Sequence, residues 1–383
     1  MITHPLLTPA HLALRDRVRE FAEKEVKPVA ANLDETEEFS IELTAKMGEA
    51  GFFGIQAPKE LGGHALDTLS YIIIVEELAR VDSSQAATIA AVNSLAIAPL
   101  LKYGTPDQIK KYVPSLTTGR MTWAFGLTEE NAGSDAMGSQ TTSELVDGYW
   151  VINGQKMHIT NSTSEISGGV IVQALTGEIN GRKKLSAIIV EKDTPGFTRE
   201  RSFGKLMWRA SDTGRLYFDN VRVPQSNLLG EVGQGGRIML NTLDAGRLSV
   251  AAIGLGLAQG AFEEAIAHSK KRQQFGQAIH KFQAVAFKIA DMDVKIELAR
   301  NTLYHACWKK DNGMQFAREA AIAKLYTSEI AREIADETLQ IHGAAGVFKP
   351  HPVERFYRDQ RLLQIGEGTS EILRMVISRY LGL

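Results

Sequence analysis

Hydrophobic and polar positions divide the chain into three zones, and the first, up to about residue 120, has helical spacing. Thr8-Pro9 and Thr105-Pro106 each place an N-cap before a proline at the first helical position, and Ser40 can cap a further short helix. LSYIIIVEELARV, residues 69–81, is apolar on nearly every side. This pattern predicts a helical domain with a buried helix near its centre.

The second zone, about 121 to 228, has the pattern of strands. LVDGYWVINGQKMHIT, residues 145–160, holds Asp147-Gly148 and Asn153-Gly154 between apolar and β-branched residues, which predicts hairpin turns. Further strands are expected in GGVIVQAL, LSAIIVEK and RLYFDNVRVP, with a turn at Thr194-Pro195-Gly196. The even spacing predicts a small antiparallel barrel or sandwich.

The third zone, from about residue 229, returns to long helices. FQAVAFKIADMDVKIELAR carries Ile289, Met292 and Ile296 on one stripe, and breaks occur at 311–313 and 343–346. Long helices with short connections predict a bundle. The chain is therefore expected to be an α+β protein with a helical domain at 1–120, a β domain at 121–228 and a helical bundle at 229–383.

Composition narrows the class of protein. The 383 residues are 44% apolar and 23% charged, with a net charge of −2, so no basic excess favours nucleic acid or an anionic membrane. The first residues have no basic region before an apolar core, and the apolar runs are too short or too interrupted to cross a bilayer. One cysteine fits a reducing compartment. We expect a cytoplasmic enzyme without nucleic-acid or membrane partners.

Several familiar motifs are missing or incomplete. GLGLAQG, residues 254–260, has Gln259 where a dinucleotide-binding loop has its third glycine, and it lies within a helical pattern, so close helix packing explains its glycines better. His305 and Cys307 are too few and wrongly spaced for zinc, and no metal site is predicted.

Two segments carry candidate chemistry against a simpler alternative. FGLTEENAGSD, residues 125–135, leaves a strand in a loop whose amides and hydroxyls can face a polar cofactor, but an ordinary strand exit fits its composition equally well. In KRQQFG, residues 271–276, Arg272 can grip a phosphate while Phe275 packs on a planar group, or the cations simply complement a helix C-terminus.

Taken together, the segments resemble one family along essentially the whole chain. FGLTEENAGSD, GQKMHITN, LDAGR, KRQQFG, QIHGAAG, PVERFYRD and GEGTSEI occur in the order typical of acyl-CoA dehydrogenases, nearest to the short-chain, butyryl-CoA type. The resemblance implies an N-terminal helical domain, a middle antiparallel β-barrel and a C-terminal four-helix bundle. It also implies FAD, an acyl-CoA substrate, a homotetramer, and electron transfer to an electron-transfer flavoprotein.

The resemblance further implies roles for the matching residues. FAD would contact Phe125, Leu127, Thr128, Gly133, Ser134, His158, Ile159, Thr160, Arg272, Phe275, Gln283, Gln340, Gly343, Ala344, Thr369 and Glu371. The acyl-CoA would contact Ser134, Asp244, Gly246, Arg247, Gly366 and Gly368. Glu367 would be the catalytic base. Some relatives carry the base at the position of Gly246 instead, where a glycine cannot act.

The residues around Glu367 suit that role chemically. The α-carbon of a saturated thioester is a very weak acid, so a carboxylate removes its proton only when burial strengthens the base. An apolar lead-in, LLQI, precedes Glu367, and Gly366 and Gly368 allow the backbone to turn it into a cleft. The alternative is a solvated acid in a loop, with Thr369 capping the helix SEILRMVISRY.

Four positions depart from the family pattern. His158 replaces a tryptophan, Gly366 a tyrosine, Ala344 a glycine and Glu130 a proline. The lost tyrosine volume predicts a branched, alicyclic or aryl-bearing substrate rather than butyrate. Two rival functions stay open: an oxygen-using flavoenzyme of the same fold (an acyl-CoA oxidase or a flavin monooxygenase), and a non-catalytic flavin- or acyl-CoA-binding protein.

Overall fold

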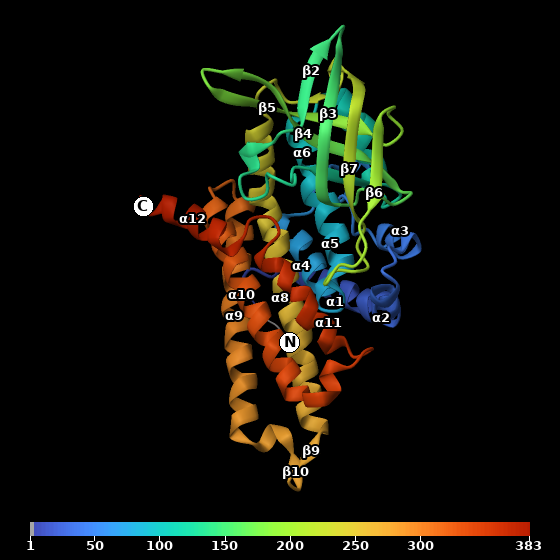
Figure 1. The fold of residues 1–383 in the computed structure, drawn as a ribbon. Helices are drawn as coiled ribbons and strands as arrows, with labels where there is room; N and C mark the ends of the chain where they lie inside the picture. The colour runs from blue at the N-terminus through green and yellow to red at the C-terminus, as the bar shows by residue number, and fades with distance from the viewer. Residues whose placement is uncertain (1–3) are drawn as a thin grey trace.

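The computed structural model describes residues 4–383 and begins with a set of short helices (Figure 1). Its helices before the sheet are α1 (Pro9–Phe21), α2 (Lys27–Thr36), α3 (Ile41–Glu49), α4 (Thr68–Ala79), α5 (Ser83–Ala91), α6 (Ala98–Tyr103) and α7 (Pro106–Leu116). The predicted caps are confirmed: Thr8, Ser40 and Thr105 each accept a hydrogen bond from a first-turn amide. Every residue of α4 is buried, as its pattern predicted.

The middle zone is one sheet that curves around its own core. Its strands are β1 (Thr122–Gly126), β2 (Thr142–Val146), β3 (Tyr149–Thr160), β4 (Ser167–Ile179), β5 (Arg182–Glu191), β6 (Phe197–Arg201), β7 (Thr213–Pro224) and β8 (Leu228–Leu229). The order is β6-β7-β3-β2-β4-β5-β8, and β1 also joins β4. The expected antiparallel pairing holds for most neighbours, but β4 runs parallel to β1 and β2. Parallel pairs require a long crossover, and the chain between β1 and β4 supplies one.

One of the two predicted hairpin turns is wrong. Asp147-Gly148 does turn the chain between β2 and β3, with φ of 52° and 78°. Asn153-Gly154 lies inside β3, where the register against β7 shifts, so it forms a bulge. Gly154 has φ 143°, and a Cβ there would lie 2.7 Å from Thr141 Oγ1. An Asn-Gly pair signals an unusual backbone angle, which a bulge uses without reversing the strand.

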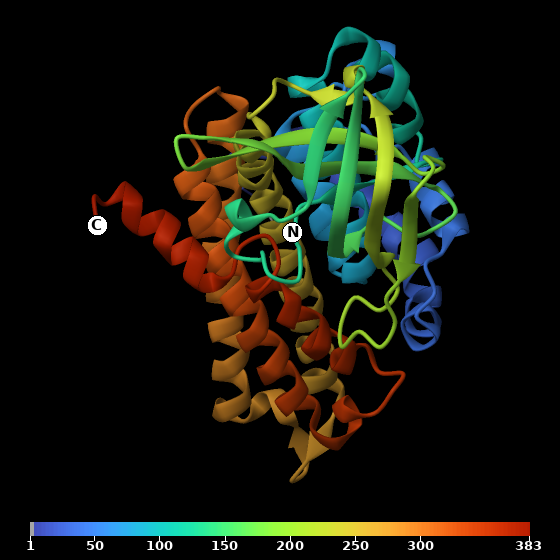
Figure 2. The ribbon, with the colours of Figure 1, turned by 45° about the horizontal axis from the view of Figure 1, so that its top comes forward.

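The last zone is the predicted helical bundle, beside the sheet in Figure 2. Its helices are α8 (Gly235–Lys271), α9 (Gln283–Asp311), α10 (Ala317–His342), α11 (Pro352–Asp359) and α12 (Ser370–Tyr380). A small ribbon of β9 (Gln273–Gln274) and β10 (Gln277–Ala278) joins α8 to α9 at the far end. Methyl groups at Gly256 or Gly260 would overlap the backbone of α4 and the residue that follows it, which confirms the packing explanation of GLGLAQG.

The apolar helices are core elements. A continuous core joins the N-terminal helices, one face of the sheet and the bundle, and a second core fills the β domain. The prediction that no apolar run could cross a bilayer was wrong on length: the continuous helix at 83–103 has 21 residues and α8 has 37. Within their apolar windows, 78% and 67% of residues are buried, as expected for helices at the centre of a folded protein.

Candidate active site

Glu367 lies in a tight turn between a 3₁₀ segment, Gln360–Gln364, and α12. Its φ is 53° and that of Gly368 is 99°, so two successive residues adopt left-handed angles. A non-glycine residue held in this region costs about 1–3 kcal/mol, which the surrounding structure must offset. Thr369 then caps α12 by accepting a hydrogen bond from the amide of Ile372. The turn points the Glu367 side chain back toward the bundle.

The Glu367 carboxylate rests on the backbone of α8. A methyl group at Gly246 would overlap its Oε2 atom, and Leu95 closes the same spot. Oε2 is buried and has no hydrogen-bond partner among residues 4–383. The alternative of a solvated acid is therefore wrong, although its helix cap at Thr369 is correct. A side chain at position 246 would therefore occupy the place that the Glu367 carboxylate fills.

Burial controls the proton affinity of this acid. Burial raises the pKa of Glu367 to about 7, and the positive charges of Lys324 and Arg247 act in the opposite direction. Lys324 Nζ donates to the carbonyl oxygen of Gly368 at 2.6 Å, and Arg247 Nη1 donates to Asp244 Oδ1 at 2.5 Å. A carboxylate with this pKa is partly ionised near neutral pH. It is also a stronger base than a carboxylate on the protein surface, whose pKa is lower.

The predicted acyl-CoA residues converge in part. Asp244, Gly246 and Arg247 lie on one turn of α8, and Gly366 and Gly368 flank the acid. A Cβ at Gly368 would lie 4.0 Å from Arg247 Nη2, so the two segments face each other. Ser134 is exposed on the loop after β1. That loop packs on the start of α8, where a Cβ at Gly236 would lie 2.7 Å from Met137.

Models of three acyl-CoA dehydrogenase domains match the chain in succession: the N-terminal domain at residues 8–120, the middle domain at 124–221 and the C-terminal domain at 233–382. The chain belongs to the acyl-CoA dehydrogenase family. It is 44% identical to the probable acyl-CoA dehydrogenase YngJ of Bacillus subtilis over 98% of both chains. It is 42% identical to the caffeyl-CoA reductase-Etf complex subunit CarC of Acetobacterium woodii, over 95% of this chain and 96% of that one.

A solved relative has the same architecture throughout. Butyryl-CoA dehydrogenase from Megasphaera elsdenii superimposes with a TM-score of 0.95 and 39% identity, and the match covers 100% of both chains. The predicted fold is confirmed by this match together with the domain models.

Some of the residues predicted to contact FAD lie in the β domain, apart from the acyl-CoA residues around Glu367. Phe125, Leu127 and Ile159 are buried and expose little surface to a ligand. Thr128 and Thr160 are half-buried, and the amide of Met157 donates to the Thr128 carbonyl at 3.0 Å. That bond ties the loop after β1 to β3.

His158 differs from its neighbours on β3. Its side chain is exposed and its φ is 59°, at the point where β3 bulges against β7. The bulge turns this side chain out of the regular alternation of the strand.

A buried ion pair behind the loop was missed in the sequence. Glu129 Oε1 accepts a hydrogen bond from Lys156 Nζ at 2.6 Å and from Ser139 Oγ at 2.5 Å, and its other oxygen accepts one from the Gln140 amide. Burial works to raise the pKa of Glu129, but the charge and hydrogen bond of Lys156 prevail and lower the pKa to about 2. The available signal was a lysine within a strand of otherwise alternating apolar positions.

The remaining FAD residues lie at the other end of the bundle. Arg272, Gln283, Gln340, Gly343 and Ala344 are exposed there. Gly246 and Arg272 are separated by about 39 Å along α8, at 1.5 Å per residue. One chain therefore does not bring this group to Glu367.

Phe275 does not pack on a planar group within the described chain. It is 93% exposed, with only an edge contact to Phe282.

The two groups nonetheless fit a large polar cofactor. The side chains of Thr128, Ser134, Thr160, Arg272 and Gln283 donate to no residue in the described range 4–383, so their donors are free for phosphate and ring edges. Thr369 is the N-cap of α12 and Glu371 lies in its first turn, where the free amides favour negative charge.

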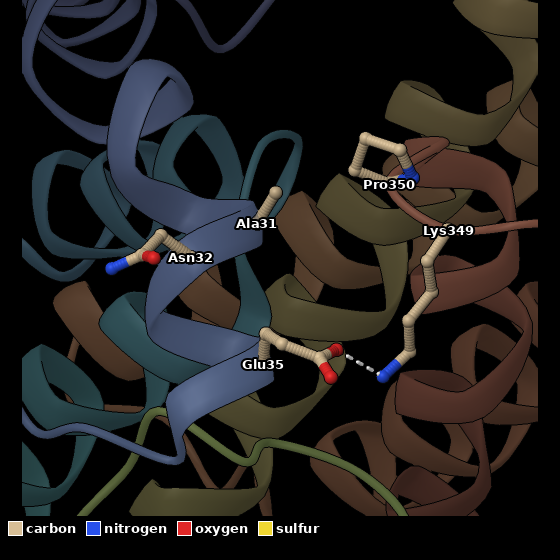
Figure 3. A pocket seen from close by; sticks show the side chains of 5 residues that line it. All are labelled: Ala31, Asn32, Glu35, Lys349 and Pro350. Carbon is tan, nitrogen blue, oxygen red and sulfur yellow. Dashed lines mark hydrogen bonds and ion pairs between the residues drawn. The ribbon is translucent and has the colours of Figure 1, made fainter.

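Two other features carry less chemistry. A surface hollow of about 320 Å³ between α2 and the loop before α11 is lined by Ala31, Asn32, Glu35, Lys349 and Pro350 (Figure 3). It contains an ion pair of 2.5 Å between Glu35 and Lys349 but none of the predicted site residues.

A histidine cluster adjoins Gly343. Glu264, His342 and His351 have ligand atoms within 4.8 Å of one another. However, His351 Nδ1 accepts the amide hydrogen of Val353, which places the proton of a neutral ring on Nε2. His342 Nδ1 donates to Thr338 O. The His342 bond leaves its Nε2 lone pair free, but a neutral His351 has no free ring lone pair, so the three residues do not form a set of three metal ligands.

Proposed function

We propose that this chain is an FAD-dependent acyl-CoA dehydrogenase in which Glu367 removes the α-proton of the thioester. The observation that carries this is the buried Glu367 oxygen without a hydrogen-bond partner, held against Gly246. A group buried at such cost, with a pKa near 7, is typical of a functional site.

The chain's own residues divide the work. Ionised Glu367 takes the α-proton onto its carboxylate. Its backbone N–H donates to no described residue and is therefore free to donate to the thioester oxygen as negative charge develops there. Asp244, Arg247 and Ser134 bind the acyl-CoA. Thr128, Ser134 and Thr160 would hold the flavin end of FAD, which would supply a two-electron acceptor for the hydrogen of the β-carbon.

The two separated groups of FAD residues point to an assembly. We infer that Arg272, Gln283 and the segment 340–344 bind the adenine-diphosphate half of an FAD held by a second copy, within a homotetramer. The distance of about 39 Å along α8 between Gly246, beneath Glu367, and Arg272 supports this arrangement. The electron acceptor is an electron-transfer flavoprotein, supported by the relative that belongs to a complex with Etf. We place the protein in the cytoplasm. The division of the chain into three domains at residues 120 and 228 remains our prediction.

The substrate is bulkier than butyrate near the α- and β-carbons. A Cβ at Gly366 would make only ordinary contacts, at 3.6 Å from Leu362. The position therefore has room for a side chain, and the glycine leaves that room to the substrate. The relative named as a caffeyl-CoA reductase supports an aryl-bearing acyl group.

A panel of thioesters tests the proposed acyl group: branched and ring-bearing acyl-CoAs should turn over faster than butyryl-CoA. The Gly366→Tyr variant should reverse that preference.

The main test is anaerobic titration of the flavin absorbance with acyl-CoA. The wild-type yellow colour should bleach, and Glu367→Gln should slow bleaching by about 100- to 10,000-fold because the α-proton loses its acceptor. Bleaching of Glu367→Gln at the wild-type rate would reject the proposal. Colour that no acyl-CoA bleaches would favour the binding protein, and rapid reoxidation of bleached enzyme by air would favour an oxidase.

A further inference from the structure

Two side chains of α10 hold the turn that carries Glu367. Lys324 Nζ donates to the carbonyl of Gly368 at 2.6 Å, directly after the acid. Ser328, one helical turn further along, donates through Oγ to the carbonyl of Leu363 at 2.9 Å, before the acid. The two donors thus fix the backbone on both sides of Glu367. One donor is cationic and the other is neutral.

Lys324 is unusual because its side chain is completely buried. Its relative exposure is 0%, and no carboxylate lies within ion-pair distance of its ammonium in the described chain. Burial lowers the pKa of Lys324 to about 8, while the charges of Glu367 and Glu371 support the protonated form. Hydrogen bonding to Gly368 alone would not require a buried cation, because a neutral donor such as Ser328 does the same for Leu363.

The other groups around the acid are few. Arg247 reaches it from α8, but Asp244 already pairs with that guanidinium. Tyr71 faces it from α4 as a neutral phenol that donates to Ala90 O. Gly246 and Leu95 contribute no charge. Lys324 is therefore the cation near Glu367 whose charge is not already matched by a carboxylate at hydrogen-bond distance in the described residues.

We propose that Lys324 is a positioning residue for the α-proton abstraction of the proposed dehydrogenase: it fixes the Glu367 turn, and its positive charge favours the ionised form of the base near neutral pH. Ser328 shares the first role but not the second. The inference rests on the proposed function, and it assigns to α10 a role for which no sequence motif was noted. Without the ammonium, less positive charge would offset the cost of burying the Glu367 carboxylate. The carboxylate would then take up a proton at higher pH.

The decisive measurement is the protonation midpoint of Glu367 itself, without turnover. Infrared difference spectra of the FAD-loaded protein, with Glu367→Gln as background, follow the carboxyl band between pH 5 and 10. Lys324→Met and Lys324→Gln should both raise the midpoint by about one pH unit or more, since an opposite charge at close range typically shifts a pKa by about one to three units. Having two neutral replacements protects the test if one of them does not fold.

The matched variants separate charge from anchoring. Lys324→Arg keeps the charge and should restore the midpoint, whereas Ser328→Ala removes only the neutral donor and should leave it unchanged. The rate of anaerobic bleaching should change with the ionisation of Glu367. In Lys324→Met this rate should be about tenfold below wild type at pH 6 and should recover toward the wild-type rate at pH 9.

Two results would overturn the inference. One is a wild-type midpoint in both neutral variants, and the other is an equal upward shift in Ser328→Ala. The proposed function is judged separately by Glu367→Gln, because the infrared midpoint requires no dehydrogenation. An inactive Glu367→Gln with unmoved Lys324 variants would therefore reject only the role of Lys324.

Discussion

Two glutamates with buried carboxylate oxygens have opposite environments. Glu129 in the β domain accepts hydrogen bonds from Lys156, Ser139 and backbone amides, and its pKa falls to about 2. Glu367 in the bundle turn has a buried oxygen without a partner, and its pKa rises to about 7. The same side chain thus becomes a structural anion in one place and a candidate base in the other. Its partners, rather than its burial, decide which.

The comparison also shows that a buried lysine supports the backbone at both sites. The Glu129 ion pair lies behind the loop that carries Thr128 and Ser134, so it holds the surface that faces a cofactor. Lys324 and Ser328 hold the turn that carries the candidate base. In both cases a buried lysine supports a functional backbone segment, but only in the bundle does the neighbouring acid keep a free oxygen.

The largest expected effect on stability comes from breaking the Glu129 pair. Lys156→Met leaves a buried carboxylate without its cation and should lower the free energy of unfolding by about 3–5 kcal/mol. Lys183→Met is the matched control, because Lys183 donates to backbone carbonyls of the same loop from the protein surface. Thermal unfolding at a fixed FAD concentration measures both. A loss in Lys156→Met no greater than in the control would contradict the importance of the pair.

A somewhat smaller effect of opposite sign is expected at Glu367. Its folded pKa of about 7 lies above its ordinary value of 4.5, so the protonated acid is favoured and stability declines as pH rises through 7. Glu367→Gln mimics the protonated form and should unfold with a free energy about 3 kcal/mol higher at pH 8 but unchanged at pH 4. Glu371→Gln, at an exposed acid nearby, should show no such rise. An equal gain at both pH values would count against a raised pKa.

The pH dependence of Glu129 should run the other way. Its folded pKa of about 2 lies below 4.5, so its stabilising contribution is present above pH 4.5 and is lost as pH falls toward 2. Glu129→Gln should therefore be less stable than wild type by about 2 kcal/mol at pH 7, with the difference closing near pH 2. Unfolding curves across that range measure it, and a difference that persists undiminished at pH 2 would disprove the ion-pair account.

The smallest effect tests the contact between α8 and the acid. Gly246→Ala places a methyl group where Oε2 of Glu367 lies, so the carboxylate must move. The rate of anaerobic bleaching should fall about 10- to 100-fold, because small displacements of a reacting group are costly. Flavin content and thermal stability should stay near wild type. An unchanged rate would show that the acid does not act from this position.

Local chemistry determined much of this fold in advance. Threonine and serine caps, the Asp147-Gly148 turn and the largely apolar pattern of α4 all depend on neighbours in sequence. The ordered motifs gave the family and, through it, the candidate base and the two groups of FAD residues. Such features were predictable because a few adjacent residues fix a backbone angle or a hydrophobic face.

Only the tertiary structure decided the rest. The parallel pairing of β1 with β4, the Glu129–Lys156 pair and the placement of Lys324 beside Glu367 join residues between 27 and 46 positions apart, and the bulge at Gly154 depends on the neighbouring strand β7. The raised pKa of Glu367 belongs to the same class, because solvent exclusion and long-range charges exist only once the helices have packed.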